Sequence, residues 1–588
     1  MVKIFRNLRK REIGLILLSV IFVAVSVWLD LKLPDYMSEV TILVKTEGST
    51  MLDVLKAGGK MLLCAFGSLV AAIIVGFFAA QVAAGFSSRL RSRMFSKVGN
   101  FSMEEINGFS TASLITRSTN DITQIQNFVA MGLQVMVKAP IMAVWAVCKI
   151  LGKSWQWTAA TGGAVVFLMA VIATVLIFAY PKFKKVQTLT DNLNRVTREN
   201  LTGIRVVRAY NAEEYQEKKF SKANDELTDT NIFVFRFMSV MMPSMNIVMN
   251  GISLVIYWIG AFLINKAQAM DKITVFSDMV VFSSYAVQVI MSFVMLAMIF
   301  IMMPRAAVSA KRINEVLDTV PNIREGSLSE SEPENAGTVE FRNVSFRYPD
   351  AADNVLENIS FTAKKGETVA FIGSTGSGKS TLVNLIPRFY DATEGEVLVD
   401  GVNVREYKSE ALNNKLGYVP QKAVMFSGTV SSNVSYGKNP NNPGNIPDEV
   451  KNAVEIAQGT EFVEKMPDTY NSQIAQGGTN ISGGQKQRLA IARAVYRKPE
   501  ILIFDDSFSA LDYKTDRILR STLKKETSDT TTLIVAQRIG TIKDADKIIV
   551  LDEGKMAGMG THSELLKNCE VYRQIALSQL SKEELENA

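Results

Sequence analysis

The stretch GSTGSGKS at residues 373–380 decides the fold of the second half of this 588-residue chain. It fits the pattern G-x-x-x-x-G-K-[ST], and it lies between a strand-like segment, 367–372, and a helical segment, 380–386. The glycines allow backbone N–H groups to wrap a chain of phosphates, and the helix N-terminus attracts anions. We therefore expect an α/β domain that binds a nucleotide. The expected binding residues here are Gly373, Ser374, Thr375, Gly376, Ser377, Gly378, Lys379, Ser380 and Thr381.

Two side chains of this loop and one downstream acid predict how the nucleotide is held. Lys379 would reach the β- and γ-phosphates, and the hydroxyl of Ser380 would ligate Mg²⁺. The apolar residues 501–504 end at Asp505, as expected of a buried strand that ends beside the metal. Because the loop precedes the acid in the order that such sites require, the pair predicts ATP bound with Mg²⁺.

The composition indicates a membrane half joined to a soluble half. Apolar residues make up 48% of the chain, yet 21% are charged, and all five Trp lie before residue 306. The polar stretch 321–337 reads as a linker between a membrane domain, 1–320, and a cytosolic domain, 338–588. The net charge of +6 is small for this length and gives no reason to expect nucleic-acid binding. The three separated cysteines support neither a disulfide framework nor a zinc site.

The first half contains apolar segments long enough to cross about 30 Å of hydrocarbon. The first of them is too long for a signal peptide and has no small-x-small cleavage site, so we expect it to be retained. Lys and Arg gather in 1–12, 87–127 and 181–239, which by the positive-inside tendency places both termini in the cytosol. The six predicted spans are 13–33, 61–86, 128–151, 157–180, 240–264 and 275–303.

Two of the basic loops are long and read as helical. At 1.5 Å per residue, out-and-back helices in 87–127 and 181–239 would extend roughly 30 to 45 Å below the membrane. We expect such arms to carry motion between a cytosolic domain and the membrane. A structural stalk is the alternative, and loop length does not separate the two.

The segment ISGGQKQR at 481–488 resembles the signature of ATP-binding cassette (ABC) transporters. The order of other motifs is also similar to that family: a tyrosine before the phosphate loop, GYVPQ ending at residue 421, and SALD at 509–512. The resemblance continues through LITRSTND at 114–121 and GIRVVRAY at 203–210 in the membrane half. It implies an all-α six-helix exporter-type membrane domain followed by an α/β P-loop ABC nucleotide-binding domain.

The resemblance also implies a head-to-tail dimer of cassettes, in which each ATP lies between the phosphate loop of one chain and the signature of the other. Tyr348 would stack on adenine, and Gln421 would link Mg²⁺ and the attacking water to the membrane domain. The residues that would complete the ATP site of the partner are Ser482, Gly483, Gly484 and Gln485.

Two residues depart from the family pattern. Asp506 occupies the place of the glutamate that polarises water, and Gln537 occupies the place of the switch histidine. The lost methylene withdraws the carboxylate by about 1.5 Å, and misplacement by about 1 Å can slow a reaction about 10²-fold. A Gln amide donates a hydrogen bond but carries no proton. The only histidine, His562, lies far downstream in an expected surface turn. We therefore expect this site to bind ATP and hydrolyse it slowly.

The chain thus resembles the degenerate-site subunit of a bacterial heterodimeric multidrug exporter in the plasma membrane. The alternatives are ordinary drift in a competent site, a homodimeric exporter with slow sites, a lipid or peptide exporter, and a cassette protein in which ATP only gates a pore.

The membrane segments give limited information on the substrate. Met residues recur at helical spacing in 238–249 and 291–303, and flexible Met surfaces can repack around varied apolar ligands, although Met facing lipid is equally compatible. Asn246 and Asn250 are expected to face a bundle interior. Lys138, a charge within a predicted span, is expected to mark a functional site or to extend to the inner interface.

Overall fold

The computed structural model divides the chain into two compact units. One unit is Met1–Gly99 with Thr111–Thr319, and the other is Asn100–Ser110 with Val320–Ala588. The structure describes residues 2–6, 8–46, 48–151, 154–268, 271–330, 333–349, 351–437 and 447–579.

The first unit is all-α, and within the described residues it contains six helical segments long and apolar enough to cross a membrane. α3 has 49 residues, about 74 Å at 1.5 Å per residue, so much of it must extend beyond about 30 Å of hydrocarbon. The helices of this unit are α1 (Val2–Phe5), α2 (Lys10–Lys45), α3 (Met51–Gly99), α5 (Thr111–Thr116), the π-helix η1 (Arg117–Asp121), α6 (Ile122–Ile150), α7 (Trp155–Thr202), α8 (Ile204–Ala209), α9 (Glu213–Lys266) and α10 (Asp271–Asp318).

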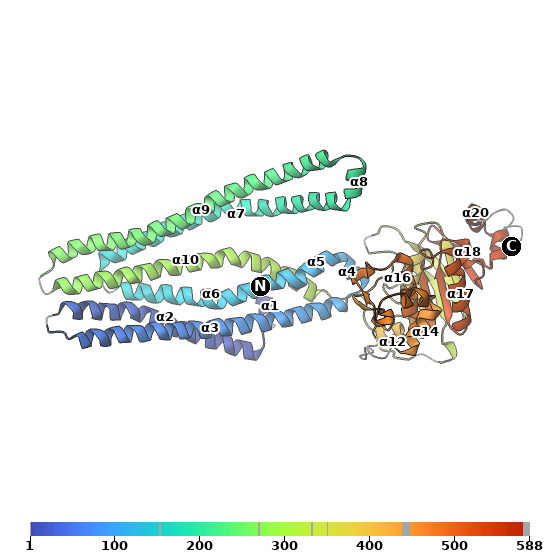
Figure 1. Ribbon diagram of the computed structural model, residues 1–588, viewed down its shortest axis with the longest axis horizontal. Helices are drawn as coiled ribbons and strands as arrows, with labels where there is room; N and C mark the ends of the chain where they lie inside the picture. The colour runs from blue at the N-terminus through green and yellow to red at the C-terminus, as the bar shows by residue number, and fades with distance from the viewer. Residues whose placement is uncertain are drawn as a thin grey trace. The chain divides into compact units, whose positions relative to one another are not determined.

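The helices of this unit form two groups. α2, α3, α6 and α10 pack together, and α7 pairs along its length with α9. Figure 1 shows that the short α8 joins α7 to α9 at one end of this pair, where the pair diverges from α10. Asn246 and Asn250 are exposed on α9, so the prediction that they face the interior of the bundle is wrong for the single chain. Packing against α7 and α10 leaves that face of α9 uncovered.

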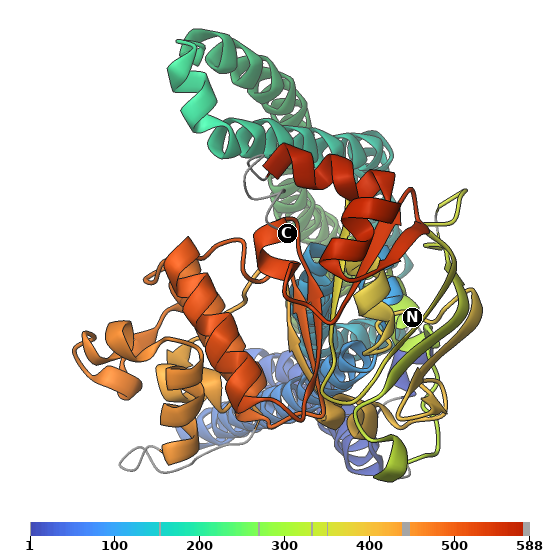
Figure 2. The ribbon, with the colours of Figure 1, turned by 90° about the vertical axis from the view of Figure 1, so that its right-hand side faces the viewer.

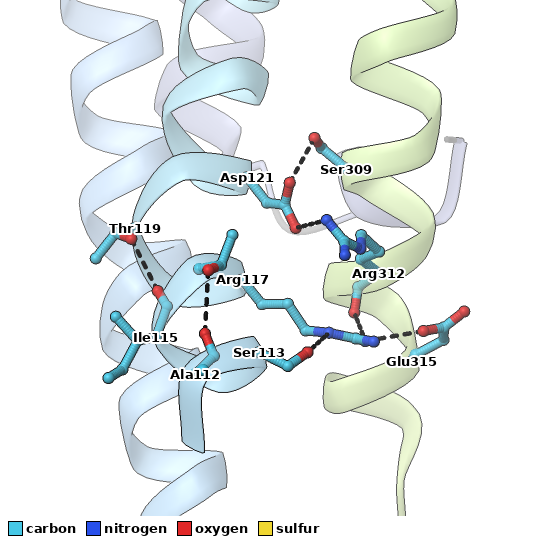
Figure 3. A network of polar contacts seen from close by, with 10 residues as sticks. Ala112, Ser113, Ile115, Arg117, Thr119, Asp121, Ser309, Arg312 and Glu315 are labelled. Atoms are coloured by element: carbon cyan, nitrogen blue, oxygen red, sulfur yellow. Dashed lines mark hydrogen bonds and ion pairs between the residues drawn. The ribbon is translucent and has the colours of Figure 1, made fainter. Parts of the chain in front are cut away.

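A network of polar contacts connects the π-helix η1 to α10 (Figure 3). Arg117 donates to the backbone oxygen of Arg312 at 2.7 Å and to Glu315 at 2.8 Å. Asp121 is buried, accepts a hydrogen bond from Ser309 at 2.8 Å, and lies 3.7 Å from a nitrogen of Arg312. Residues four apart lie on the same side of a helix, so Arg117 and Asp121 both face α10.

The described residues of the second unit form three β-sheets. A mixed six-stranded sheet has the order β12-β11-β3-β10-β9-β6, an antiparallel four-stranded sheet has the order β2-β1-β4-β5, and β7 pairs with β8. In the six-stranded sheet every pair is parallel except β11 with β12. The strands are β1 (Val339–Phe346), β2 (Leu356–Ala363), β3 (Thr368–Gly373), β4 (Glu394–Val399), β5 (Val402–Asn403), β6 (Leu416–Val419), β7 (Gly428–Thr429), β8 (Gln473–Ile474), β9 (Ile501–Asp505), β10 (Thr531–Val535), β11 (Lys547–Asp552) and β12 (Lys555–Gly560).

Alternating apolar side chains of the six-stranded sheet enter two separate cores. On β3, Val369 and Phe371 pack with the antiparallel sheet, whereas Ala370 and Ile372 pack with helices on the opposite face. Figure 2 shows these helices and the antiparallel sheet on opposite sides of the central strands. The helices of this unit are α4 (Met103–Phe109), η2 (Pro333–Asn335), α11 (Lys379–Leu385), α12 (Ser409–Lys415), α13 (Val430–Val434), α14 (Asp448–Ile456), α15 (Thr460–Glu464), η3 (Thr469–Asn471), η4 (Gln476–Gly478), α16 (Gly483–Tyr496), α17 (Tyr513–Glu526), α18 (Ile539–Ile542), α19 (His562–Asn568) and α20 (Glu570–Gln579).

One helix of the second unit comes from the first half of the sequence. α4 contacts the α/β domain through Asn107, whose amide donates to the hydroxyl of Tyr390 at 3.1 Å. The carboxylate of Glu105 accepts a hydrogen bond from the backbone of Asn322 at 2.9 Å. The predicted fold class, a six-helix membrane domain followed by an α/β P-loop domain, is confirmed, but this helix belongs structurally with the α/β part.

Candidate nucleotide site

The phosphate loop connects β3 to α11, at the carboxyl end of a parallel strand. Gly376 and Gly378 have φ values of +89° and +93°, in the left-handed region that favours glycine. A Cβ on Gly378 would lie 2.7 Å from a methyl of Leu356 and 2.9 Å from the carbonyl oxygen of Val355. This position therefore requires glycine. Ser374 and Thr375 lie exposed at the tip, whereas Ser377 is buried.

Lys379 lies inside the loop. Its ammonium donates to the carbonyl oxygens of Gly373 at 2.9 Å and Ser374 at 2.6 Å, and to the hydroxyl of Ser377 at 3.2 Å. Burial lowers the pKa of this ammonium, and the nearby carboxylates Asp506 and Asp505 oppose that shift. The ammonium thus already satisfies its donors with the acceptors of the loop, and a phosphate would replace them.

Asp505 ends β9, all of whose residues are buried. The hydroxyl of Ser380 donates to its carboxylate at 2.7 Å. Burial raises the pKa of Asp505, the Ser380 hydrogen bond lowers it, and the adjacent Asp506 raises it further. A hydroxyl and a carboxylate oxygen side by side are the kind of ligands that Mg²⁺ takes in nucleotide sites, so the residues present fit that ion.

Asp506 follows in a conformation that is uncommon for a residue with a side chain, with φ +47°. One of its carboxylate oxygens accepts from the amide of Gln537 at 2.8 Å and from the amide of Gln421 at 3.3 Å. Burial raises the pKa of Asp506, and Gln421, Lys379, Arg538 and Gln537 lower it in that order. The two residues that depart from the family pattern are therefore in direct contact.

Tyr348 lies beside the start of α11. Its hydroxyl lies 3.1 Å from the hydroxyl of Thr381, and its ring contacts Phe346 and Tyr390 edge-on. These contacts fix a half-buried aromatic ring next to the phosphate loop, where a base could stack.

The signature residues begin α16. Ser482 is the N-cap: its hydroxyl accepts from the backbone of Gln485 at 3.3 Å, and its own N–H donates to the side chain of Gln485 at 2.8 Å. Ser482 and Gly483 are exposed, and a Cβ on Gly484 would lie 3.3 Å from the carbonyl oxygen of Ala510. Among the described residues, no hydrogen bond joins these four to the phosphate loop. The structure therefore brings together the loop, Asp505, Asp506, Gln421 and Gln537, and leaves the signature directed outward.

The prediction of a surface turn at His562 is wrong. This residue starts α19, is 9% exposed, and its Nδ1 lies 2.6 Å from the hydroxyl of the buried Tyr572. The polar sequence around it reflects the cap of α19, in which the hydroxyl of Thr561 accepts from the backbone of Glu564. The contact between Asn107 and Tyr390 could not be predicted, because no local pattern relates residues that are 283 positions apart.

Both halves match known families. Residues 356–509 match the family described as ABC transporter, and residues 13–293 match the ABC transporter transmembrane region. With the six-helix unit and the phosphate loop, these matches define an ABC exporter half-transporter with an ATP-binding domain. The chain belongs to the ABC transporter family.

Several relatives cover most of the chain. An uncharacterized ABC transporter ATP-binding protein of Mycobacterium bovis is 39% identical over 90% of this chain and 88% of its own length. The ABC transporter ATP-binding protein YfiB of Bacillus subtilis is 37% identical over 88% of both chains. An ATP-dependent lipid A-core flippase of Pseudomonas aeruginosa is 31% identical over 83% of this chain and 79% of its own length.

A solved structure of a bacterial Atm1-family ABC exporter with ATP bound has the same fold. It has a TM-score of 0.77, covers 97% of this chain and 99% of its own, and is 24% identical. At that identity the similarity concerns the fold alone.

Proposed function

We propose that this chain is the degenerate-site subunit of a heterodimeric multidrug exporter. Its own site binds Mg-ATP through Gly373 to Thr381, Asp505 and Tyr348, with Ser380, Asp505 and Gln421 around the metal. Hydrolysis there is slow, and Ser482 to Gln485 complete a competent site on the partner.

The observation that carries this proposal is the contact of Asp506 with Gln537. A general base must be within hydrogen-bond reach of the water proton that it takes. Here one oxygen of the shortened carboxylate already accepts two amide hydrogen bonds. Neither amide can take the proton away, because a Gln side chain does not titrate. The site is therefore better suited to holding ATP than to turning it over.

The exposed signature supports the second part of the proposal. Ser482 and Gly483 are at the N-terminus of the 14-residue α16, where backbone N–H groups and the helix dipole favour an anion. Among the described residues, the hydrogen bonds between Ser482 and Gln485 cap this helix end, and none joins it to the phosphate loop of the same chain. A nucleotide held by a second cassette would supply the phosphate.

The membrane unit supports an apolar or amphipathic substrate. Met242, Met298 and Met303 are exposed on α9 and α10, Met279 is buried, and the other Met side chains in 238–249 and 291–302 are half-buried. The similarity to a lipid A-core flippase favours a second candidate, export of a lipid. We place the assembly in the bacterial plasma membrane with both termini in the cytoplasm, as the distribution of basic residues suggests.

Purification of a tagged form of this chain from its native membrane tests the proposal. A second ABC half-transporter with glutamate and histidine at the two departing positions is expected in equal amount. Recovery of this chain alone as a homodimer with full ATPase activity would refute the asymmetric assembly. Uptake of a fluorescent amphiphile into inverted vesicles against a gradient distinguishes an exporter from an ATP-gated pore.

A further inference from the structure

A cluster of polar side chains lies within the apolar helices of the membrane unit. Lys138 of α6 donates to the carboxylate of Asp30 on α2 at 3.0 Å. Ser68 of α3 donates to the other oxygen of that carboxylate and lies 3.2 Å from Ser26 of α2. The amide of Gln288 on α10 donates to the backbone oxygen of Asp30 at 3.4 Å. We call Ser26, Asp30, Ser68, Lys138 and Gln288 the polar seam.

The polar seam lies opposite the apolar outer face of α2. Leu17, Ile21 and Trp28 are exposed at helical spacing and form one stripe. At 100° per residue, Asp30 lies about 180° around the helix from Ile21. A charge directed at hydrocarbon is costly. The side chains of Lys138 and Asp30 are nevertheless 27% and 22% exposed, so the open side of the seam is expected to face water or a ligand.

The seam also has unused hydrogen-bonding capacity. The side-chain oxygen of Gln288 is buried and accepts no hydrogen bond from the residues that the structure describes. The Lys138 ammonium has three donors, one of which is directed at Asp30. A buried acceptor without a donor destabilises the fold, so a group that brings a donor to Gln288 would be stabilised there.

We propose that the polar seam binds the zwitterionic head group of an amphipathic substrate. The anionic part of the head group pairs with Lys138, and the cationic part pairs with Asp30 and lies near Gln288. This inference rests on the proposed export of amphipathic molecules and names the class of substrate.

Charge balance in the polar seam favours a zwitterion. Asp30 and Lys138 together carry no net charge, and each is the partner of the other. A singly charged head group that binds one of them leaves the second ion partly buried without a partner, which is strongly unfavourable. A zwitterion supplies an opposite charge to both Asp30 and Lys138. The polar seam therefore discriminates against singly charged head groups, because each of them leaves one ion of the pair without its counter-charge.

The test uses three probes with one octyl tail and different heads: octylphosphoethanolamine, octylammonium and octyl sulfate, because a primary ammonium has N–H donors for Gln288. The tagged chain is purified with any partner into phosphatidylglycerol nanodiscs, which contain no zwitterionic lipid. Binding is followed by tryptophan fluorescence, because all five Trp of this chain lie in its membrane half. ATP turnover and vesicle transport are measured in parallel. We expect the phosphoethanolamine probe to bind about tenfold more tightly than either singly charged probe.

Two variants separate a ligand site from a purely structural ion pair. Lys138→Gln should shift the preference to the ammonium probe, and Asp30→Asn should shift it to the sulfate probe. Lys149→Gln is the matched control, since Lys149 is on the same helix and pairs with a different carboxylate, Asp35, at 2.7 Å. It should leave the preference unchanged.

Opposite shifts of selectivity support the subsite. Equal weakening of all three probes, or no change in either variant, would overturn it. If a single variant fails to fold, the exchanged pair Asp30→Lys with Lys138→Asp retains an ion pair and should retain the zwitterion preference. Intact probe selectivity without ATP-driven transport would instead refute the proposed exporter function.

Discussion

The contact between Asp506 and Gln537 predicts that hydrolysis at this site cannot be restored one residue at a time. Three variants test this prediction: Asp506→Glu, Gln537→His, and the double variant that combines them. The added methylene advances the carboxylate by about 1.5 Å. Since the Gln537 amide is 2.8 Å from that carboxylate now, a straight advance would leave only about 1.3 Å between the two atoms. The longer side chain must therefore turn away unless residue 537 also changes.

The expected magnitude follows from this conflict. Residues in direct contact couple by about 0.5–3 kcal/mol, which is about 2- to 150-fold in rate. Each single variant should raise phosphate release from this site by only a few fold. The double variant should exceed the product of the two single effects by at least about tenfold.

The assay is single-turnover release of labelled phosphate by the complete assembly in nanodiscs, with protein in excess over ATP. Asp506→Glu with Gln537→Asn is the matched control, because it shortens the amide without supplying a ring that can carry a proton. If Asp506→Glu alone reaches the rate of the double variant, the contact does not restrain the carboxylate and the reasoning fails.

Three further predictions concern other contacts. Lys379→Ala should weaken ATP binding at this site at least about tenfold, because the ammonium is the only side-chain charge within the loop, 373–380. Unchanged binding of a fluorescent ATP analogue would contradict this role. Asp121→Ala should lower the free energy of unfolding by about 1–3 kcal/mol, because the buried Ser309 hydroxyl loses its acceptor. Asp121→Asn retains an acceptor and should cost less. Equal melting temperatures for the two variants would count against the network. Burial lowers the pKa of His562, so below about pH 6.5 the unfolded chain binds more protons than the folded chain, and stability falls as the pH falls. His562→Gln should therefore reduce the decline of the melting temperature between about pH 7 and 5.5. An equal decline in the variant and the unmodified protein would oppose the assignment.

The phosphate loop could be predicted because it is local. Its glycines, lysine and serine adopt one shape for reasons contained within eight residues, 373–380, and the flanking periodicity identifies the strand and the helix. The same locality made the six apolar spans visible, so the fold class followed from the sequence.

The remaining features depend on contacts between distant residues. Lys138 was expected to be functional or to extend to the membrane interface, and only the packing of α2 against α6 reveals Asp30 as its partner, 108 positions away. Asp506 and Gln537 were each recognised as departures, but the hydrogen bond between them requires β9 and β10 to be neighbours. His562 was misplaced because its polar surroundings form a helix cap over a buried ring.

The position of α4 affects what happens when the chain is cleaved in the linker or expressed without its first half. A protease that cleaves the linker, 321–337, severs one covalent connection but leaves Asn107 of the longer fragment bonded to Tyr390 of the shorter one. The two fragments therefore stay in contact through α4, which packs with the α/β part although it precedes the linker in the sequence. Conversely, an α/β domain expressed from residue 338 onward would lack α4, and the hydroxyl of Tyr390 would lose the hydrogen bond from Asn107. An isolated α/β domain used to study ATP binding should be supplied with the peptide 100–110 in trans.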